Sequence, residues 1–203
     1  MEFRLTYQGP LRAANFSEPG AKHKHEIRRV FHPQLRRLWK NNPNLGRLIE
    51  DDFPRRFDRS ESEMGASSRT AYLGSKYAYH GYNFVPLVTS DDHVWCGLEV
   101  LLLTPGGGYV LGGGDLDNRI KTLFDALRIP IEKQELGGCD ISEEDEGPFF
   151  CLLQDDKLVS KVTVETDMLL EPISNPPASS DARLIIKVTL KPTVLTWDNS
   201  RYL

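Results

Sequence analysis

Residues 94–104 form a nearly continuous apolar run in this 203-residue chain, with the sequence Val-Trp-Cys-Gly-Leu-Glu-Val-Leu-Leu-Leu-Thr. A strand with one face in water alternates apolar and polar residues, whereas a strand buried on both faces is apolar almost throughout. The run therefore predicts a central, buried strand, and the rest of the chain has to supply its neighbours and its cover.

The remaining elements follow from apolar periodicity and turn residues. Further strands are predicted over residues 3–7, 82–89, 157–165 and 183–191. The turn Ser90-Asp-Asp-His93 is expected to join the 82–89 strand to the central one as a hairpin. Helices are predicted over residues 22–39, 45–53 and 116–128. Pro33 interrupts the first helical pattern, so a break or kink is expected near His32.

This mixture predicts an α+β fold, a single domain with a mixed β-sheet flanked by helices. Residues 1–80 are expected to form a basic strand and helical region that packs on a core of residues 81–203. Residues 130–150 hold paired glycines and the run Glu143-Glu-Asp-Glu146, which predicts an acidic, loop-like insertion. Its part from Glu132 to Gly147 is expected to be mobile and dispensable for folding, because it has few large apolar residues to bury.

Composition narrows the setting of the chain. No stretch approaches the roughly 18 consecutive apolar residues of a membrane span, and the N-terminus lacks the long apolar run of a signal peptide. The cysteines Cys96, Cys139 and Cys151 follow no CxxC or zinc spacing, so a reducing, cytoplasmic setting is expected. Residues 1–80 carry 15 basic against 9 acidic residues, and residues 81–203 carry 10 against 20. Such asymmetry can indicate an anion-binding face beside a metal site, or only solvated charges.

Acidic residues gather at the start of the 116–128 helix. The stretch Asp115-Leu-Asp117-Asn118-Arg-Ile-Lys121 is followed by Asp125, so that Asp117, Lys121 and Asp125 share one helix face. A second acidic pair, Asp155-Asp156, opens a downstream apolar stretch. Carboxylates gathered in this way repel one another unless a cation joins them. Since Mg²⁺ takes one or two carboxylates with water and a substrate phosphate, the pattern indicates metal-dependent chemistry on a phosphodiester.

Structural roles could explain each acid taken singly. Asp115 or Asp117 could cap the helix, Lys121 could pair with Asp117 one turn away, and Asp155-Asp156 could form a plain turn. A cap needs only one acid, however, and this helix begins with two. Both interpretations stay open on the spacing alone.

Basic residues concentrate in the predicted helix over residues 22–39. They are interleaved with Phe31 and Trp39, a pattern that could follow a nucleic-acid backbone or form a solvated helix face. The candidate nucleic-acid-binding residues are Lys22, Lys24, Arg28, Arg29, Arg36, Arg37 and Lys40.

The acidic motifs resemble those of a known family. The pattern Asp115-x-Asp117-Asn118-x-x-Lys121-x-x-x-Asp125-Ala-Leu, followed by Asp155-Asp156, is similar to that of the RusA family of crossover-junction endodeoxyribonucleases. The resemblance covers roughly residues 82–191. It implies a small homodimeric nuclease that cuts Holliday junctions with Mg²⁺, or Mn²⁺, as cofactor.

Carried onto this chain, the resemblance implies a set of catalytic residues. Asp115, Asp117 and Asp156 would hold the metal, and Lys121 would stabilise developing charge. Supporting residues would be Asn118, Asp125 and Asp155. The implied reaction is phosphodiester hydrolysis in branched DNA. The rival hypothesis is a nucleic-acid-binding or regulatory protein that keeps the fold without cutting, for which the acidic insertion could cover the site or mimic DNA.

Overall fold

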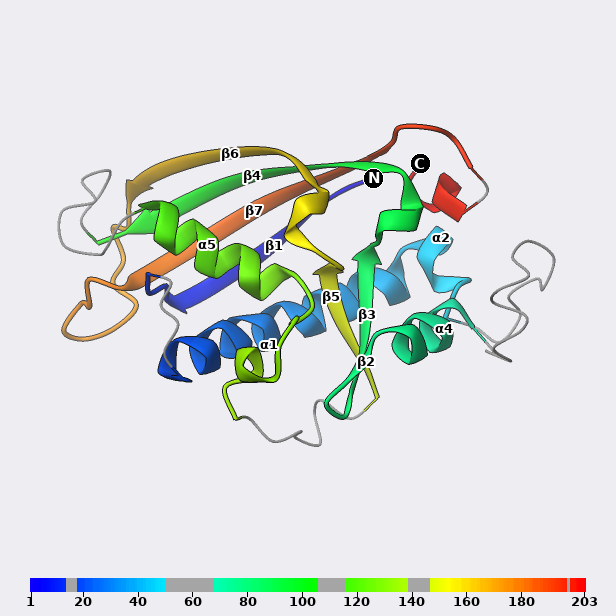
Figure 1. Ribbon diagram of the computed structural model, residues 1–203. Coiled ribbons are helices and arrows are strands. Elements are labelled where there is room, and N and C mark those ends of the chain that lie inside the picture. The colour runs from blue at the N-terminus through cyan, green and yellow to red at the C-terminus, as the bar shows by residue number, and fades with distance from the viewer. Residues whose placement is uncertain (14–17, 50–67, 106–115, 139–146, 197) are drawn as a thin grey trace.

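A four-stranded mixed sheet in the order β1-β7-β4-β6 forms the larger layer of the protein (Figure 1). The structure, a computed structural model, describes residues 1–13, 18–49, 68–105, 116–138, 147–196 and 198–203. β7 is antiparallel to β1 and β4, whereas β4 and β6 are parallel. The strands are β1 (Glu2–Pro10), β4 (Val94–Thr104), β6 (Val159–Met168) and β7 (Asp181–Pro192). The apolar run over residues 94–104 is thus an interior strand, as predicted.

A smaller sheet has the order β2-β3-β5, with strands Ala78–Tyr79, Tyr82–Val88 and Pro148–Leu153. The predicted hairpin between residues 82–89 and 94–104 is wrong, because β3 and β4 belong to different sheets. Ser90–Asp92 form a short 3-10 turn, η1, and His93 follows with a left-handed φ of 48°. The chain therefore turns a corner here instead of folding back. Both strands are largely buried, and each finds its partners in its own sheet.

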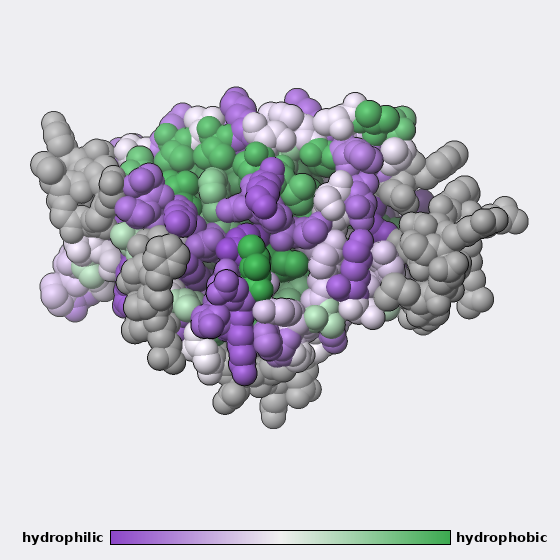
Figure 2. All heavy atoms as spheres, viewed as in Figure 1, coloured by the Kyte–Doolittle hydropathy of each residue, from purple (hydrophilic) through white to green (hydrophobic). Residues whose placement is uncertain are grey.

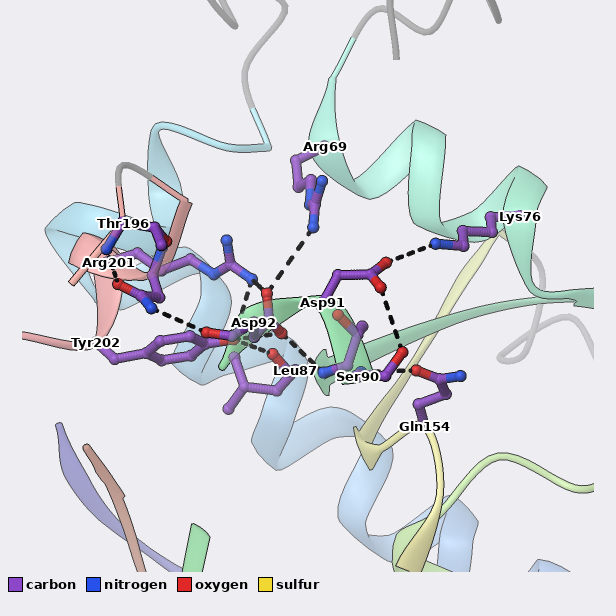
Figure 3. A network of polar contacts seen from close by, with 12 residues as sticks. Arg69, Lys76, Leu87, Ser90, Asp91, Asp92, Gln154, Thr196, Arg201 and Tyr202 are labelled. Atoms are coloured by element: carbon purple, nitrogen blue, oxygen red, sulfur yellow. Dashed lines mark hydrogen bonds and ion pairs between the residues drawn. The ribbon is translucent and has the colours of Figure 1, made fainter. Parts of the chain in front are cut away.

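A buried polar network holds this corner (Figure 3). The Asp92 side chain is fully buried and accepts hydrogen bonds from the Thr89 backbone N–H at 2.7 Å and from the Tyr202 hydroxyl at 2.9 Å. Arg201 forms an ion pair with the same carboxylate. Arg201 and Tyr202 belong to η5 (Asp198–Tyr202), so the C-terminal turn is tied to the junction of the two sheets.

Helix α1 (Glu18–Asn41) crosses beneath both sheets (Figure 1). Ile27, Phe31, Leu35 and Trp39 recur at helical spacing, and each is at most 1% exposed. Of the break or kink expected near His32, the break is absent, since α1 continues through Pro33. Pro33 is exposed, so the carbonyl one turn earlier, which receives no N–H from proline, can bind water. The apolar residues before and after Pro33 pack on the core and hold the helix together.

The other helices are α2 (Pro43–Gly46), α4 (Arg69–Lys76) and α5 (Leu116–Leu127), with the short turns η2 (Lys133–Leu136) and η4 (Asp156–Leu158). The predicted 45–53 helix overlaps α2 only at Leu45 and Gly46, residues 47–49 form a turn instead, and residues 50–67 lie outside the described part. None of the helices in that part combines the length and the hydropathy that a membrane span needs. The described elements form a single α+β domain with mixed sheets flanked by helices, as predicted.

The first residues of the predicted insertion belong to the core. η2 packs on α1, and Leu136 is only 4% exposed. Gly137 has a left-handed φ of 61°, and a Cβ atom there would lie 2.2 Å from Lys22 Cα, so only glycine fits. The expectation that Glu132–Gly147 is dispensable therefore fails for residues 132–138. Residues 139–146, with the run Glu143–Glu146, lie outside the described residues.

Candidate active site

Helix α5 lies along the large sheet on the way from β4 to the parallel strand β6 (Figure 1). Leu123, Ala126 and Leu127 are at most 1% exposed, because the helix turns these residues toward the core. This orientation leaves Asp117 and Lys121 exposed on the outer face of α5. The predicted stripe of Asp117, Lys121 and Asp125 is therefore solvent-facing at its start and buried at its end.

Asp125 closes the stripe inside a cluster of ion pairs. Its carboxylate lies 2.7 Å from Lys24 Nζ and 3.0 Å from Arg128 Nη2, and all three side chains are about nine-tenths buried. A buried carboxylate stays ionised only with such partners. Asp125 therefore already has the positive charge that it needs from the protein itself.

Two arginines extend this cluster. Arg128 donates two hydrogen bonds to Glu135, at 2.9 and 3.0 Å. Burial lowers the pKa of Arg128, but the hydrogen bond and charge of Glu135, with the charges of Asp125 and Asp156, outweigh this and raise it. Arg28 is fully buried, and its guanidinium donates to the carbonyls of Asp125 at 2.7 Å and Arg128 at 3.0 Å. Arg28 thus satisfies carbonyls at the α5 C-terminus that no helical N–H reaches.

The chain brings Asp155 and Asp156 to the same end of α5. Ile129 N–H donates to the Leu153 carbonyl at 3.0 Å, and Arg128 forms a parallel bridge with Leu153. The acidic pair follows directly, and η4, which Asp156 begins, packs on α5. Because η4 contacts α5, these acids lie on the helix side of the sheet.

The two neighbouring acids have opposite pKa shifts. The Lys157 backbone N–H donates to Asp155 Oδ1 at 2.9 Å and lowers the pKa of Asp155. Burial raises the pKa of Asp156, and its hydrogen bond with Asp155 adds to this. The charge of Asp125 acts in the same direction, and the charge of Arg128 opposes it. The ionised Asp155 therefore opposes ionisation of Asp156.

The described residues do not bring all the predicted metal ligands together. Asp117 lies in the first turn of α5, and its Oδ1 accepts a hydrogen bond from the Asn118 N–H at 2.7 Å. Eight residues separate it from Asp125, which is about 12 Å along a helix. Asp156 lies near the Asp125 end, and Asp115 lies outside the described residues. Among the residues that can be described, no group of three His, Cys, Asp or Glu side chains is placed to hold a metal ion.

The acidic pair is the part of the site that fits a hard cation. Asp125 and Glu135 have cationic partners, whereas Asp155 and Asp156 face one another with Lys157 as the nearest ion-pair partner of Asp155, at 3.6 Å. Two neighbouring carboxylates present the oxygen ligands that Mg²⁺ prefers. Joint binding by Asp115, Asp117 and Asp156 stays a prediction, since the first of these is not described.

The predicted nucleic-acid-binding residues separate into two groups. Lys24 and Arg28 are buried in the ion-pair cluster, so we remove both from the binding surface. Arg29 is half-buried. The exposed members are Lys22, Arg36, Arg37 and Lys40.

Sequence reasoning missed three residues that shape the site. Arg128 and Glu135 neutralise the end of α5, and Arg119, which is 3% exposed, donates to the Ser179 carbonyl at 2.7 Å. The three-residue spacing from Asp125 to Arg128 was a usable signal, since it places the side chains on one helix face. Glu135 and Arg119 gave none, because their partners follow from the tertiary fold.

Comparison with known proteins adds no relative to this description. No protein-family model, curated protein or solved structure matches the chain.

Proposed function

We propose that this protein is a Mg²⁺-dependent endonuclease that hydrolyses phosphodiester bonds in branched DNA, similar to the RusA family. The observation that carries the proposal is the contact between η4 and α5, because it sets Asp156 against the helix that bears the D-x-D-N-x-x-K motif. Both acidic motifs thereby lie on the same helix side of the sheet, with Asp156 near the Asp125 end of α5 and Asp117 about 12 Å away at its start.

Each residue has a role in this proposal. The proposed Mg²⁺ ligands are Asp115, Asp117 and Asp156, and joint binding would require Asp156 to approach the start of α5 from the Asp125 end, where it now lies. The bound ion would lower the pKa of a water molecule and polarise the scissile phosphate. Asp155, the more acidic member of its pair, keeps its charge and favours a cation beside Asp156. Lys121, which is exposed one turn from Asp117, would contact phosphate oxygens. Asn118 and Asp125 support this helix face, and Mn²⁺ would serve as an alternative ion.

The proposed partners are DNA and a second copy of the chain. Arg36, Arg37 and Lys40 offer an exposed cationic surface for the phosphate backbone. Cys96 and Cys151 are buried free thiols, which fits a reducing compartment such as the cytoplasm.

A binding or regulatory protein without nuclease activity is the second candidate. It is favoured by Asp125, whose carboxylate is fully occupied by Lys24 and Arg128. Lys24 and Arg128 already neutralise this carboxylate, so it does not require a metal ion. The two candidates differ in whether cleavage occurs, and both bind DNA.

The deciding experiment is a cleavage assay on a four-way junction, a flap and a linear duplex, each with Mg²⁺, Mn²⁺ or EDTA. We expect cleavage of the branched substrates with either ion and none with EDTA. Asp117→Asn should abolish cleavage while DNA binding stays equal or becomes tighter, because a metal ligand and a phosphate-repelling charge are lost together.

Glu2→Gln is the matched control, since Glu2 is an exposed acid on β1 that pairs with Lys187 and belongs to neither acidic motif. It should cut like the parent protein. Junction binding without cleavage under any ion would reject the nuclease and leave the binding protein. Normal cleavage by Asp117→Asn would reduce Asp117 to a helix-start residue.

A further inference from the structure

The two edges of the large sheet are treated differently. At the β1 edge, the Gln34 side chain from α1 accepts a hydrogen bond from Thr6 N–H at 2.9 Å and donates to the Thr6 carbonyl at 2.7 Å. It thus occupies the backbone groups with which another strand would pair. At the opposite edge, β6 is bonded to β4 and has no further strand beside it in the described part of the chain. An open edge strand is a ready surface for pairing with another chain.

An apolar surface lies beside this open edge. Val162 is 41% exposed, and Leu158 and Val164 are half-buried next to it. Val162 pairs with Leu98 and Val164 with Val100, so both valines point to the side of the sheet that α5 covers. Figure 2 shows the resulting apolar surface over α5 and β6. Pairing of β6 with another strand would bury these exposed aliphatic side chains.

The sequence of β6 is self-complementary. Residues 161–165 read Lys-Val-Thr-Val-Glu, so reversing the segment exchanges a cation for an anion and keeps the centre unchanged. In an antiparallel pair about Thr163, Lys161 lies opposite Glu165 of the second copy and Val162 lies opposite its Val164. Opposite charges and β-branched pairs in facing positions stabilise a sheet. A two-fold axis repeats each of these contacts.

Within the described chain, neither Lys161 nor Glu165 has an ion-pair partner of its own. Lys187 and Glu99 on the neighbouring strands pair with each other instead, with Nζ and Oε2 3.7 Å apart. Both charges on β6 are therefore available to a facing strand.

We propose that β6 pairs antiparallel with β6 of a second copy of this chain, centred on Thr163, to join two four-stranded sheets into one. The valines of both copies would cluster on the helix side of the junction, and the two Lys-Glu pairs would lie on the other side. Pairing would set the two α5 helices on the same face, related by the two-fold axis. Only the consequence for cutting, two symmetric active sites, rests on the proposed nuclease function.

The first test is a cysteine cross-link in a Cys139→Ser background, whose remaining thiols Cys96 and Cys151 are buried. Thr163→Cys places two thiols opposite each other at the axis, within the roughly 4–7 Å between Cα atoms that a disulfide spans. Thr166→Cys is the matched control on the same strand. In this register its two copies are six positions apart, which is about 20 Å. Mild oxidation of the folded protein should give a disulfide-linked dimer only with Thr163→Cys.

The second test exchanges the charges. Lys161→Glu and Glu165→Lys each place like charges opposite one another twice, and each should raise the dissociation constant of the dimer by roughly three- to tenfold. The double variant restores both pairs and should return to the parent value. Sedimentation equilibrium over a dilution series measures all four proteins, and circular dichroism confirms that each is folded.

Three outcomes would overturn the proposal: a parent protein that is monomeric at every concentration, a dimer in which Thr163→Cys does not cross-link, or a double variant weaker than both single ones. Cleavage is measured separately on the same samples. A dimer that does not cut would reject the nuclease alone, whereas a monomer that cuts would reject the β6 pairing alone.

Discussion

At the scale of single residues, the two acids that follow β5, Asp155 and Asp156, have opposite pKa shifts. Burial raises the pKa of Asp156, whereas a backbone hydrogen bond lowers that of Asp155. Asp125 nearby has two cations of its own. Asp155 and Asp156 thus carry more negative charge than the protein neutralises, whereas Asp125 is neutralised. Uncompensated charge of this kind lowers stability and is typical of functional sites.

Asp156→Asn should stabilise the protein at neutral pH. The folded state raises the pKa of Asp156 above its usual 3.8. Below pH 3.8 the group therefore contributes to the free energy of unfolding, and this contribution is lost as the pH rises through the pKa of the folded state. At pH 7 the ionised Asp156 side chain destabilises the folded state, and asparagine, which carries no charge, removes this effect. Thermal unfolding at pH 7 should show a higher Tm for the variant, and the difference should shrink toward pH 4.

Adding Mg²⁺ should reverse this order. A ligand that binds only the folded state raises its Tm, so the parent should gain stability with Mg²⁺ and the variant should not. Equal gains for both proteins would show that Asp156 does not hold the ion, whatever the cleavage assay finds.

Asp92→Asn should destabilise the protein strongly. It leaves the Arg201 guanidinium buried without its carboxylate, and breaking a buried ion pair in this way costs about 3–5 kcal/mol. For a chain of this size, Tm should fall by on the order of 10 °C. Asp91→Asn, at the neighbouring exposed position, should change Tm by little, since exposed pairs contribute about 0–1 kcal/mol.

For single residues of the site, the sequence predicts only the relations that follow from spacing within one helix. The helix repeat fixes that Asp117, Lys121 and Asp125 share a face. It does not fix that Lys24 approaches Asp125, because that contact depends on how α1 crosses α5. Burial of Arg28 was missed for the same reason, since its partners are backbone carbonyls.

At the scale of elements, α1 combines two roles along its length. Its first half supplies Lys24 and Arg28 to the ion-pair cluster, and its second half exposes Arg36, Arg37 and Lys40. Phe150 N–H donates to His32 Nδ1 at 2.8 Å, so the middle of α1 also satisfies a backbone group of β5. DNA binding by α1 is therefore expected from its C-terminal half.

Replacing Arg36 and Arg37 together by Ala should weaken DNA binding and flatten its salt dependence. Each phosphate contact contributes about 0.9 to the slope of log K against log salt, so the slope should fall by up to about 2. Arg4→Ala, exposed on β1, serves as the control and should leave the slope unchanged. A slope that persists in the double variant would place the DNA on another face.

The elements that were predicted well have strong local patterns. The 94–104 strand matches β4, and the 116–128 helix matches α5 within one residue. β5 was assigned in part to the insertion, because the short apolar run Phe149–Leu153 follows an acidic stretch and has no alternation. The separation of β3 from β4 could not be foreseen, since a tight turn between two apolar strands resembles a hairpin until their partners are known.

At the scale of the whole molecule, distant parts of the chain build one core. β1 pairs with β7 along its full length from Glu2 to Pro10, and α1 packs on β5, α5 and η2. The smaller sheet and the large sheet therefore both depend on residues 1–80. The acidic motifs lie after residue 81, but the helix that carries them is buried partly against α1.

Residues 81–203 should therefore not fold alone, although they contain every predicted catalytic residue. Removing residues 1–80 opens the β7 edge and strips away Ile27, Phe31, Leu35 and Trp39 of α1, each at most 1% exposed. Burying four such side chains contributes about 6–12 kcal/mol, which is comparable to the roughly 5–15 kcal/mol stability of a typical domain. Circular dichroism and amide NMR of the fragment should show loss of fixed structure, and Asp125 would lose Lys24. Co-expression with residues 1–80 is the control and should restore a folded complex. A fragment that folds and cuts by itself would show that α1 is an accessory to the catalytic core and would separate the two parts into independent domains.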